Sequence, residues 1–384
     1  MGQGFPACVA LGTLAGMTSD DSTYNSPDTG SGQARVVRAG VVQAAPVPFD
    51  PVATLRVVER WLSEAAERNL DLVVFPEAFI GGYPKGSAFG GVVGDRTAAG
   101  REEFARYWNG AVEVPGPATD RLGELAAGAR THLVIGVVER DYGTLYCTVL
   151  FFSDTGALLG KRRKLMPTGA ERMIWGFGDG STLEVHRTKL GRLGAVICWE
   201  NMMPATRMAM YAQGIELYCA PTADSRESHH ATMRHIAMEG RCFVLAANQC
   251  LRTKDFPPDH PTPYGDDPEH LISRGGSSII GPLGEVLAGP VLDEEVLLTA
   301  DLDMGLIPRA RYDFDPVGHY ARPDIFRLHV DTTVRRAVQT SEGPSACLSD
   351  DLPSESTSSR AAPDGTTGTS IPSPSPSGPL GHRP

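Results

Sequence analysis

Residues 194–204 read GAVICWENMMP, an apolar run that ends at Cys198 and is followed by the polar residues Glu200 and Asn201. The apolar run 193–198 predicts a buried strand with a turn at its end. A cysteine at the end of a strand is most often a small core residue. The same place also suits a nucleophile, because ligands of open α/β sheets bind beyond the carboxyl ends of the strands. The residues around Cys198 alone leave both interpretations open.

Strand-like and helix-like segments alternate on both sides of this stretch. Apolar runs predict further strands at 36–44, 70–77, 132–139, 144–153, 215–221, 242–249, 277–281, 285–291 and 295–303. Apolar residues at helical spacing predict helices at about 51–68, 204–213 and 228–239. Two long segments that contain glycine and proline, 81–101 and 251–273, predict loops that wall a pocket. The alternation predicts one α/β domain over residues 36–335.

The composition bounds the class of protein. The chain has 384 residues, of which 41% are hydrophobic and 21% charged, and this is typical of a soluble globular protein. Its net charge of −11 argues against nucleic acids and acidic membrane surfaces as partners, and favours a small uncharged molecule. No apolar run approaches the roughly 20 residues of a membrane-spanning helix. The seven cysteines form no CxxC pair, which indicates reduced thiols in the cytoplasm.

Both ends of the chain differ from this middle part. Residues 1–35 include TSDDSTYNSPDTGSGQ and have too few apolar residues to order themselves, so a disordered leader is predicted. No lysine or arginine precedes the uncharged stretch 5–17, which argues against an export signal. Residues 340–384 are rich in serine, proline, glycine and threonine, and predict a disordered tail.

Two further polar residues stand at the edge of apolar stretches, as Cys198 does. Glu77 follows LDLVVFP, and Lys164 lies in GKRRKLMPTGAER. If the three side chains meet, Glu77 can accept the thiol proton and Lys164 can stabilise an anionic intermediate. Each also has a plainer interpretation, because a lone glutamate is usually a surface carboxylate. The basic run 161–164 is likewise most often a solvated face.

Three other patterns point to sites less specifically. GFGDGS (176–181) imitates a phosphate-binding loop but lacks the GK[ST] ending, so we expect a turn. Three histidines and Glu239 share one predicted helix, where a surface or packing role is favoured over a metal site. A dyad of Cys198 with His235 is an alternative for the nucleophile, although no thiol-protease signature surrounds the cysteine.

Several motifs together resemble the nitrilase branch of the carbon–nitrogen hydrolase superfamily. FPEAFIGGYPKG (75–86) is similar to the glutamate motif of that family, KRRKLMPTGAERMIWGFGDGS (161–181) to its lysine motif, and GAVICWENMMPATRM (194–208) to its cysteine motif. HIAMEGRCFVLAANQ (235–249) and GHYARPDIF (318–326) match stretches that are typical of nitrilases. The resemblance therefore covers nearly the whole of the predicted α/β domain.

By this resemblance, the family's catalytic triad falls on Glu77 as proton acceptor, Lys164 as the cation that stabilises the intermediate, and Cys198 as nucleophile, with Glu171 in support. The implied reaction is hydrolysis of an organic nitrile to a carboxylic acid and ammonia through a thioimidate and a thioester. Cyanide hydrolysis or hydration, and hydrolysis of an amide or a carbamoyl group, are alternatives within the superfamily. A catalytically silent scaffold is the alternative outside it. The cysteine supplies the nucleophile, so no metal or organic cofactor is required.

The resemblance also suggests which residues shape the substrate pocket. The candidates are Tyr83, Trp199 and His229. Two residues depart from the family pattern, since many relatives have Asn in place of Cys147 and Trp in place of His229. We expect neither departure to touch the triad, and we expect His229 to affect the substrate range.

A fold and an assembly follow from the same resemblance. The fold is expected to be a four-layer α-β-β-α sandwich of the α/β class. Subunits are expected to pair and then to grow into larger spiral homo-oligomers. The expected ligand is a small nitrile, with neither nucleic acid nor membrane as partner, and the expected location is cytoplasmic.

Overall fold

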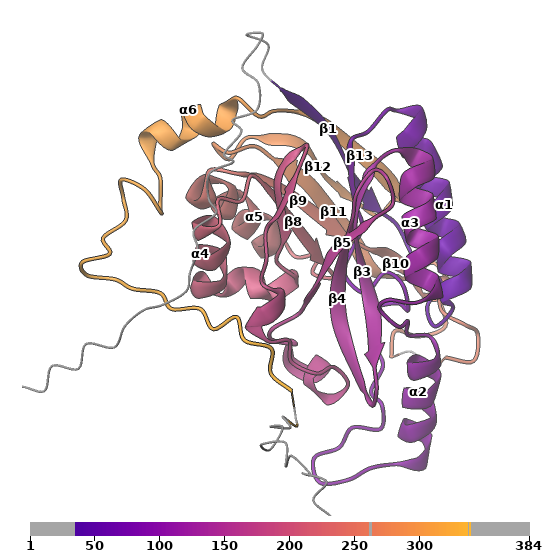
Figure 1. The fold of residues 1–384 in the computed structure, drawn as a ribbon. Coiled ribbons are helices and arrows are strands. Elements are labelled where there is room, and N and C mark those ends of the chain that lie inside the picture. The colour runs from indigo at the N-terminus through magenta and orange to yellow at the C-terminus, as the bar shows by residue number, and fades with distance from the viewer. Residues whose placement is uncertain (1–34, 261–262, 337, 339–384) are drawn as a thin grey trace, which may run out of the picture. The chain divides into compact units, whose positions relative to one another are not determined.

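Two β-sheets pack face to face, and helices cover the outer face of each sheet (Figure 1). The computed structural model describes residues 35–260, 263–336 and 338. The predicted leader, apart from Arg35, and the predicted tail 340–384 lie outside the described residues. The elements named below all lie in the unit that ends at Arg335.

Among the described residues, the first sheet has six strands in the order β13-β1-β2-β3-β4-β5. Their bounds are β1 (Val36–Gln43), β2 (Leu72–Val74), β3 (His132–Asp141), β4 (Thr144–Phe152), β5 (Leu158–Arg163) and β13 (Val296–Asp303). The second sheet follows the path β10-β11-β9-β8-β7-β6, with β12 paired to β11. Its bounds are β6 (His186–Thr188), β7 (Gly191–Ala195), β8 (Leu217–Thr222), β9 (Phe243–Asn248), β10 (Cys250–Arg252), β11 (Leu271–Ile280) and β12 (Val286–Leu292). Strands β1, β2 and β3 are parallel, as are β7, β8 and β9.

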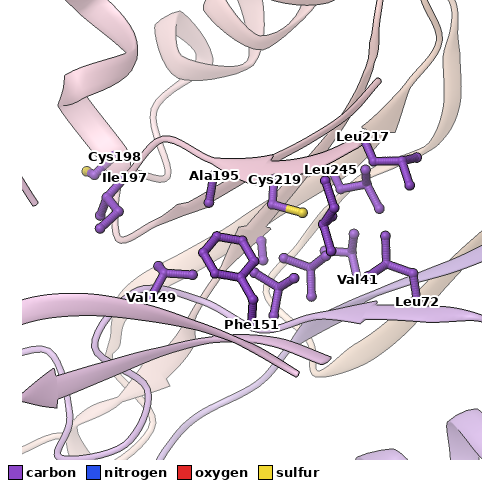
Figure 2. Packing of buried hydrophobic residues seen from close by; sticks show 14 of the residues in the cluster. Val41, Leu72, Val149, Phe151, Ala195, Ile197, Cys198, Leu217, Cys219 and Leu245 are labelled. Carbon is purple, nitrogen blue, oxygen red and sulfur yellow. The ribbon is translucent and has the colours of Figure 1, made fainter. Parts of the chain in front are cut away.

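The alternation of side chains along the strands assigns each residue to a layer. Leu72 and Val74 of β2 pack in the core between the sheets, whereas Val73 packs against the helices. On β8, Leu217 and Cys219 face the core between the sheets in the same way. Figure 2 shows Leu217 and Cys219 of β8 facing Val41 and Leu72 of the first sheet across this core. The predicted four-layer sandwich is thereby confirmed.

Helices cover the two outer faces in pairs. The three predicted helices are confirmed as α1, α4 and α5. At the start of α1, the Asp50 side chain accepts a hydrogen bond from the Ala53 backbone N–H at 2.8 Å, as its cap position requires. None of the described helices is long and apolar enough to cross a membrane. The helices have the bounds α1 (Pro51–Glu67), α2 (Ala98–Asn109), α3 (Pro117–Ala129), α4 (Pro204–Ala212), α5 (Glu227–Gly240) and α6 (Leu306–Asp313).

Helices α2, α3 and α6 were not predicted. The predicted loop 81–101 is too long, because α2 begins inside it, where the Thr97 side chain accepts a hydrogen bond from Gly100 at 3.0 Å. The predicted loop 251–273 is also too long, because its first residues belong to β10 and its last residues to β11, and these two strands pair with each other. Helix α3 buries mainly small residues and only one leucine, so its helical pattern is weak. Tertiary packing rather than local pattern stabilises these elements.

Two predicted strands are shorter than expected. The run 70–77 contributes only β2, because Pro76 has no N–H to donate and the chain leaves the sheet there. The departing chain crosses β3 at Gly136, where an added Cβ would lie 2.5 Å from the Cα of Glu77. The run 193–198 likewise contributes only the end of β7. Glu77 and Cys198, which the sequence places at the ends of these two strands, therefore lie just beyond β2 and β7.

Candidate active site

Cys198 is the first residue of the short 3-10 helix Cys198–Met202, on a tight elbow that follows β7, and it is not the last residue of a strand as predicted. Its backbone φ is +51°, a left-handed conformation that is costly for a residue with a side chain. The Asn201 amide fixes this elbow by donating to the carbonyls of Val196 at 3.0 Å and Cys198 at 2.8 Å. The Tyr218 hydroxyl in turn donates to Asn201 at 2.8 Å. Cys198 thus projects from a rigid turn at one end of the core (Figure 2).

The side chain of Glu77 is completely buried. Its position is fixed through the backbone, since the Gln249 side chain donates to the Glu77 carbonyl at 2.8 Å. Carboxylate atom Oε2 accepts hydrogen bonds from Lys164 Nζ at 3.1 Å and from Cys147 Sγ at 3.7 Å. Atom Oε1 is also buried and has no hydrogen-bond partner among the described residues. Oε2 is therefore anchored by two donors, and a hydrogen bond with the Cys198 side chain also acts to lower the pKa of this carboxyl.

The ammonium group of Lys164 joins two buried carboxylates. Its Nζ lies 3.1 Å from Glu77 Oε2 and 2.8 Å from Glu171 Oε2. Glu171 is held in turn by the Tyr83 hydroxyl at 2.6 Å and by the backbone N–H of Thr168 at 2.7 Å. The structure thus brings four of the residues singled out in the sequence, Glu77, Lys164, Glu171 and Tyr83, into one buried cluster.

The sulfur of Cys198 belongs to the same electrostatic environment. It is buried and interacts with the charges of Glu77 and Lys164. The Thr222 hydroxyl, at the end of β8, lies 3.2 Å from the sulfur. The oxygen of that hydroxyl accepts a hydrogen bond from the Asp224 backbone N–H at 3.0 Å. The Thr222 hydroxyl thus donates to the sulfur and accepts from the Asp224 N–H.

Burial and charge keep a proton on this sulfur in the resting site. Burial, and next the negative charge of Glu77, raise the pKa of the Cys198 thiol far above its ordinary value. Burial also raises the pKa of the Glu77 carboxyl, against the opposing effect of the Lys164 ammonium. Although burial lowers the pKa of Lys164, its negative neighbours hold that pKa well above the ordinary value, so the ammonium stays charged. The nucleophile is therefore not a standing thiolate and needs a base when it reacts.

The expectation that Cys147 does not touch the triad is wrong. Its thiol contacts Glu77 Oε2, and its backbone carbonyl accepts a hydrogen bond from the Lys164 N–H at 2.8 Å. Cys147 lies on β4, two residues before Val149, and shares the face of the strand that points into the core between the sheets. The sequence places Cys147 on a buried face, but only the packing of the two sheets shows that this face ends at Glu77.

Trp199 and His229 lie around a second carboxylate, that of Asp224. The Trp199 indole N–H donates to Asp224 at 2.8 Å, and the Arg226 guanidinium lies 4.8 Å from the centre of the indole ring. Hydrogen bonds from Arg226 and Trp199 outweigh burial and hold the pKa of Asp224 at about 2. Burial lowers the pKa of His229 to about 4, so its ring is neutral at pH 7. A contact of either residue with the substrate stays a prediction.

The basic run 161–164 is not a solvated face. Arg162 Nη2 and Glu200 Oε1 form an ion pair of 3.1 Å in which neither side chain is exposed. Glu200 also accepts hydrogen bonds from the backbone N–H groups of Leu165 at 2.6 Å and Ile197 at 3.0 Å. This carboxylate therefore ties the loop after β5 to the elbow after β7.

The other patterns in the sequence do not form sites in the structure. The segment 176–181 is irregular and ends in a short 3-10 turn, as predicted. His235 lies 3.6 Å from Glu239, whose carboxylate is bound by Arg207 at 2.7 Å, which gives the alternative dyad with Cys198 no support. Within the described part of the chain, no group of three or more His, Cys, Asp or Glu side chains is placed to hold a metal ion.

Three residues of the site were not singled out in the sequence, namely Glu200, Thr222 and Asp224. Thr222 carries a usable signal, because it ends β8 at the same carboxyl edge that presents Cys198 beyond β7. Glu200 lies in the motif around Cys198, but nothing local shows that it is buried against a distant arginine. Asp224 lies in a loop, where only the fold reveals its indole partner.

Comparisons with known proteins identify the family of this chain. The family model described as "Carbon-nitrogen hydrolase" matches residues 38–312. The "Aliphatic nitrilase" of Sinorhizobium fredii (strain HH103) is 59% identical over 303 residues, which cover 79% of this chain and 98% of that protein. The "Bifunctional nitrilase/nitrile hydratase NIT4B" of Nicotiana tabacum is 58% identical over 300 residues, which cover 77% of this chain and 86% of that protein.

A solved structure supports the fold. The crystal structure of a carbon-nitrogen hydrolase from Helicobacter pylori G27 is 20% identical in sequence, has a TM-score of 0.62, and covers 76% of this chain and 97% of its own. The family match spans the α/β unit from β1 to α6, and it includes Glu77, Lys164 and Cys198. The chain therefore belongs to the carbon–nitrogen hydrolase family, and within it to the nitrilase branch.

Proposed function

We propose that this protein is a nitrilase that hydrolyses an organic nitrile to the carboxylic acid and ammonia. The observation that carries the proposal is the Lys164 ammonium, held 3.1 Å from Glu77 and 2.8 Å from Glu171, in the environment of the buried Cys198 thiol. This arrangement supplies a nucleophile, a base of raised pKa and a fixed positive charge at one point. The relatives that are named nitrilases support the same substrate class.

The first step joins the Cys198 sulfur to the nitrile carbon. Glu77 takes the thiol proton as the sulfur attacks, and one bond of the C≡N triple bond becomes a lone pair on nitrogen. Lys164 stabilises the negative charge that develops on this nitrogen, and the proton then passes from Glu77 to it. The product of the step is a thioimidate, in which carbon is bonded to sulfur and doubly bonded to NH.

Water then adds to the C=N bond. Glu77 accepts a proton from the water, and the nitrogen gains it, which gives a tetrahedral carbon that carries sulfur, OH and NH2. Cleavage of the C–N bond with protonation of nitrogen releases ammonia and leaves a thioester. A second water, deprotonated by Glu77, cleaves the C–S bond, releases the acid and restores the Cys198 thiol. One nitrile and two waters thus give one carboxylic acid and one ammonia.

An amide is proposed as a second product of the same intermediate. If the C–S bond of the tetrahedral intermediate breaks before the C–N bond, one water is consumed and the free amide leaves. The observation that favours this branch is the name of the tobacco relative, which is given as both nitrilase and nitrile hydratase. The acid-to-amide ratio then reports which bond breaks first.

The test is an ammonia-release assay on the purified full chain. Aliphatic, aryl and arylaceto nitriles, cyanide and the matched amides are supplied in parallel, and acids and amides are separated by chromatography. We expect one organic nitrile class to yield acid and ammonia, and Cys198→Ala to abolish the release. Faster turnover of amides than of matched nitriles would indicate an amidase, and turnover of cyanide alone a cyanide-degrading enzyme. If neither the wild-type protein nor Cys198→Ala turned over any of these compounds, the protein would be a catalytically silent scaffold.

We further propose that the protein assembles into homo-oligomers, built from pairs of subunits, in a reducing compartment such as the cytoplasm. The assembly rests on the family resemblance. The compartment is supported by five buried free cysteines in the described part of the chain: Cys147, Cys198, Cys219, Cys242 and Cys250. Mass photometry of the full chain tests the assembly, and a single species at 41.0 kDa would contradict it.

A further inference from the structure

Two oxygens of one buried carboxylate have unlike surroundings. Glu77 Oε2 receives a hydrogen bond from Lys164 Nζ at 3.1 Å and another from the Cys147 thiol at 3.7 Å. Glu77 Oε1 is buried and unpartnered among the described residues. An unpaired oxygen of a buried carboxylate is costly unless another group engages it during function. Oε1 is therefore the oxygen of Glu77 that is free to exchange a proton, as long as Oε2 stays bound to its two donors.

Both groups that hold Oε2 come from one pair of adjacent strands. Cys147 lies inside β4, and Lys164 follows the last residue of β5, which pairs with β4. The Lys164 N–H donates to the Cys147 carbonyl at 2.8 Å, so the two residues are also joined through the backbone. The two donors thus approach Oε2 from a single rigid edge of the first sheet.

The thiol of Cys147 keeps its proton and acts as a donor. Burial, and next the negative charge of Glu77, raise the pKa of this thiol well above its ordinary value. Its side chain is almost completely buried, and it projects from a regular strand position, whereas Cys198 projects from a strained elbow. Of the two thiols beside Glu77, Cys147 is therefore placed to hold the carboxylate and Cys198 to react.

We propose that Cys147 is a positioning residue of this active site, whose thiol, together with Lys164, anchors one oxygen of Glu77 so that the other oxygen alone exchanges protons with Cys198 and with water. The inference rests on the proposed function, since it assigns Glu77 as the base. The proposal also predicts the effect of losing the Cys147 donor. The Glu77 carboxylate could then rotate, and for part of the time the proton taken from Cys198 would be bound to Oε2 instead of Oε1.

Three variants test this inference on the full chain: Cys147→Ala, Cys147→Ser and Cys219→Ala. The first removes the donor, the second keeps a donor, and the third truncates a buried cysteine of the same core that touches no ionisable group. The measurements are kcat and KM on the best nitrile, and kcat/KM as a function of pH. We expect Cys147→Ala to lower kcat about tenfold, the equivalent of one hydrogen bond, with little change in KM. The acidic limb of its kcat/KM profile should move to higher pH. Loss of a hydrogen-bond donor to the ionised Glu77 carboxylate raises the pKa of that group.

The control variants decide whether the effect is specific. Cys147→Ser should restore most of kcat and return the acidic limb toward its wild-type position, and Cys219→Ala should leave both unchanged. The proposal is overturned if Cys147→Ala and Cys219→Ala behave alike, or if the acidic limb of Cys147→Ala does not move. A cavity in the core would lower stability in both alanine variants but would not shift a pH profile.

A second measurement separates this inference from the proposed function. The rate of Cys198 alkylation by iodoacetamide, followed by peptide mass spectrometry against pH, reports the proton shared with Glu77 without any nitrile. If the wild type turns over no nitrile, the proposed function fails, and the alkylation profile still tests the role of Cys147. A profile that shifts in Cys147→Ala and recovers in Cys147→Ser supports it, and identical profiles in all variants contradict it.

Discussion

Arg162 and Glu200 form an ion pair of 3.1 Å that is completely inaccessible to solvent. The pair joins the strand that precedes Lys164 to the elbow that presents Cys198. Two backbone N–H groups, those of Leu165 and Ile197, share the same carboxylate. The buried Glu200 carboxylate therefore fixes the segment that carries Lys164 relative to the elbow that carries Cys198.

Breaking this pair should destabilise the fold. We expect Arg162→Met to lower the free energy of unfolding by about 3–5 kcal/mol, because Glu200 would be left as an uncompensated buried charge. Urea unfolding followed by circular dichroism measures the change. Arg121→Met is the control, since Arg121 makes exposed ion pairs with Glu59 and Glu124 and should leave the unfolding midpoint nearly unchanged. Equal midpoints for the two variants would show that the buried pair does not stabilise the fold.

Lys164→Met should remove the fixed positive charge of the site. We expect kcat to fall by about 10²–10³-fold, the usual effect of losing one group that stabilises a developing negative charge. The measurement is steady-state kinetics on the best nitrile, with Lys161→Met as the control. Lys161, on β5, forms an ion pair with Glu139 on β3, and among the described residues it makes no ion pair with Glu77 or Glu171. Similar losses of kcat in both variants would argue against a specific role of the Lys164 charge.

Tyr83→Phe should loosen Glu171 without removing it. The Tyr83 hydroxyl donates to Glu171 at 2.6 Å, and Glu171 in turn holds the Lys164 ammonium. We expect a decrease of about tenfold in kcat/KM, which corresponds to one hydrogen bond. Tyr211→Phe deletes a similar tyrosine–glutamate bond, to Glu239 at 2.8 Å, outside the cluster. Activity should survive in that control, and an equal loss there would contradict the assignment.

The pH dependence of kcat/KM should have an acidic limb set by Glu77. The base has to be ionised to accept the thiol proton, so activity falls as the pH is lowered through its pKa. Burial raises this pKa from the ordinary 4.5, and the fall should therefore occur at a higher pH than for an exposed glutamate. Circular dichroism at each pH checks that the protein is folded. Full activity in the folded protein down to pH 4.5 would rule out Glu77 as the base.

Removal of residues 340–384 should leave turnover unchanged. The family match ends at residue 312, and every residue described in the candidate site lies between Glu77 and Gln249. The measurement compares kcat and KM of the full chain with those of a chain ending at Gln339. A loss of activity on truncation would assign the tail a role in the site or its assembly.

The sequence predicts most of the second sheet and its helices, because β7, β8 and β9 are apolar and alternate with α4 and α5. It predicts β3 and β4 equally well as strands, and the structure joins them in a hairpin with Asp141 paired to Thr144. It fails at α2, α3 and α6, and in α3 the buried residues are mostly small and give little helical pattern. It also places Cys198 on a strand, because an elbow with positive φ has no signal in hydrophobic periodicity.

The residue types by themselves determined that Glu77, Lys164 and Cys198 are the candidates for the chemistry, because motifs carry side-chain identity and order along the chain. Only the tertiary structure decided which groups touch, because contacts across two packed sheets depend on the register of strands far apart in sequence. It placed the Lys164 ammonium between Glu77 and Glu171, and it set the Cys147 thiol against the same carboxylate. The local sequence indicates only that Cys147 is buried, since nothing near it names its partner.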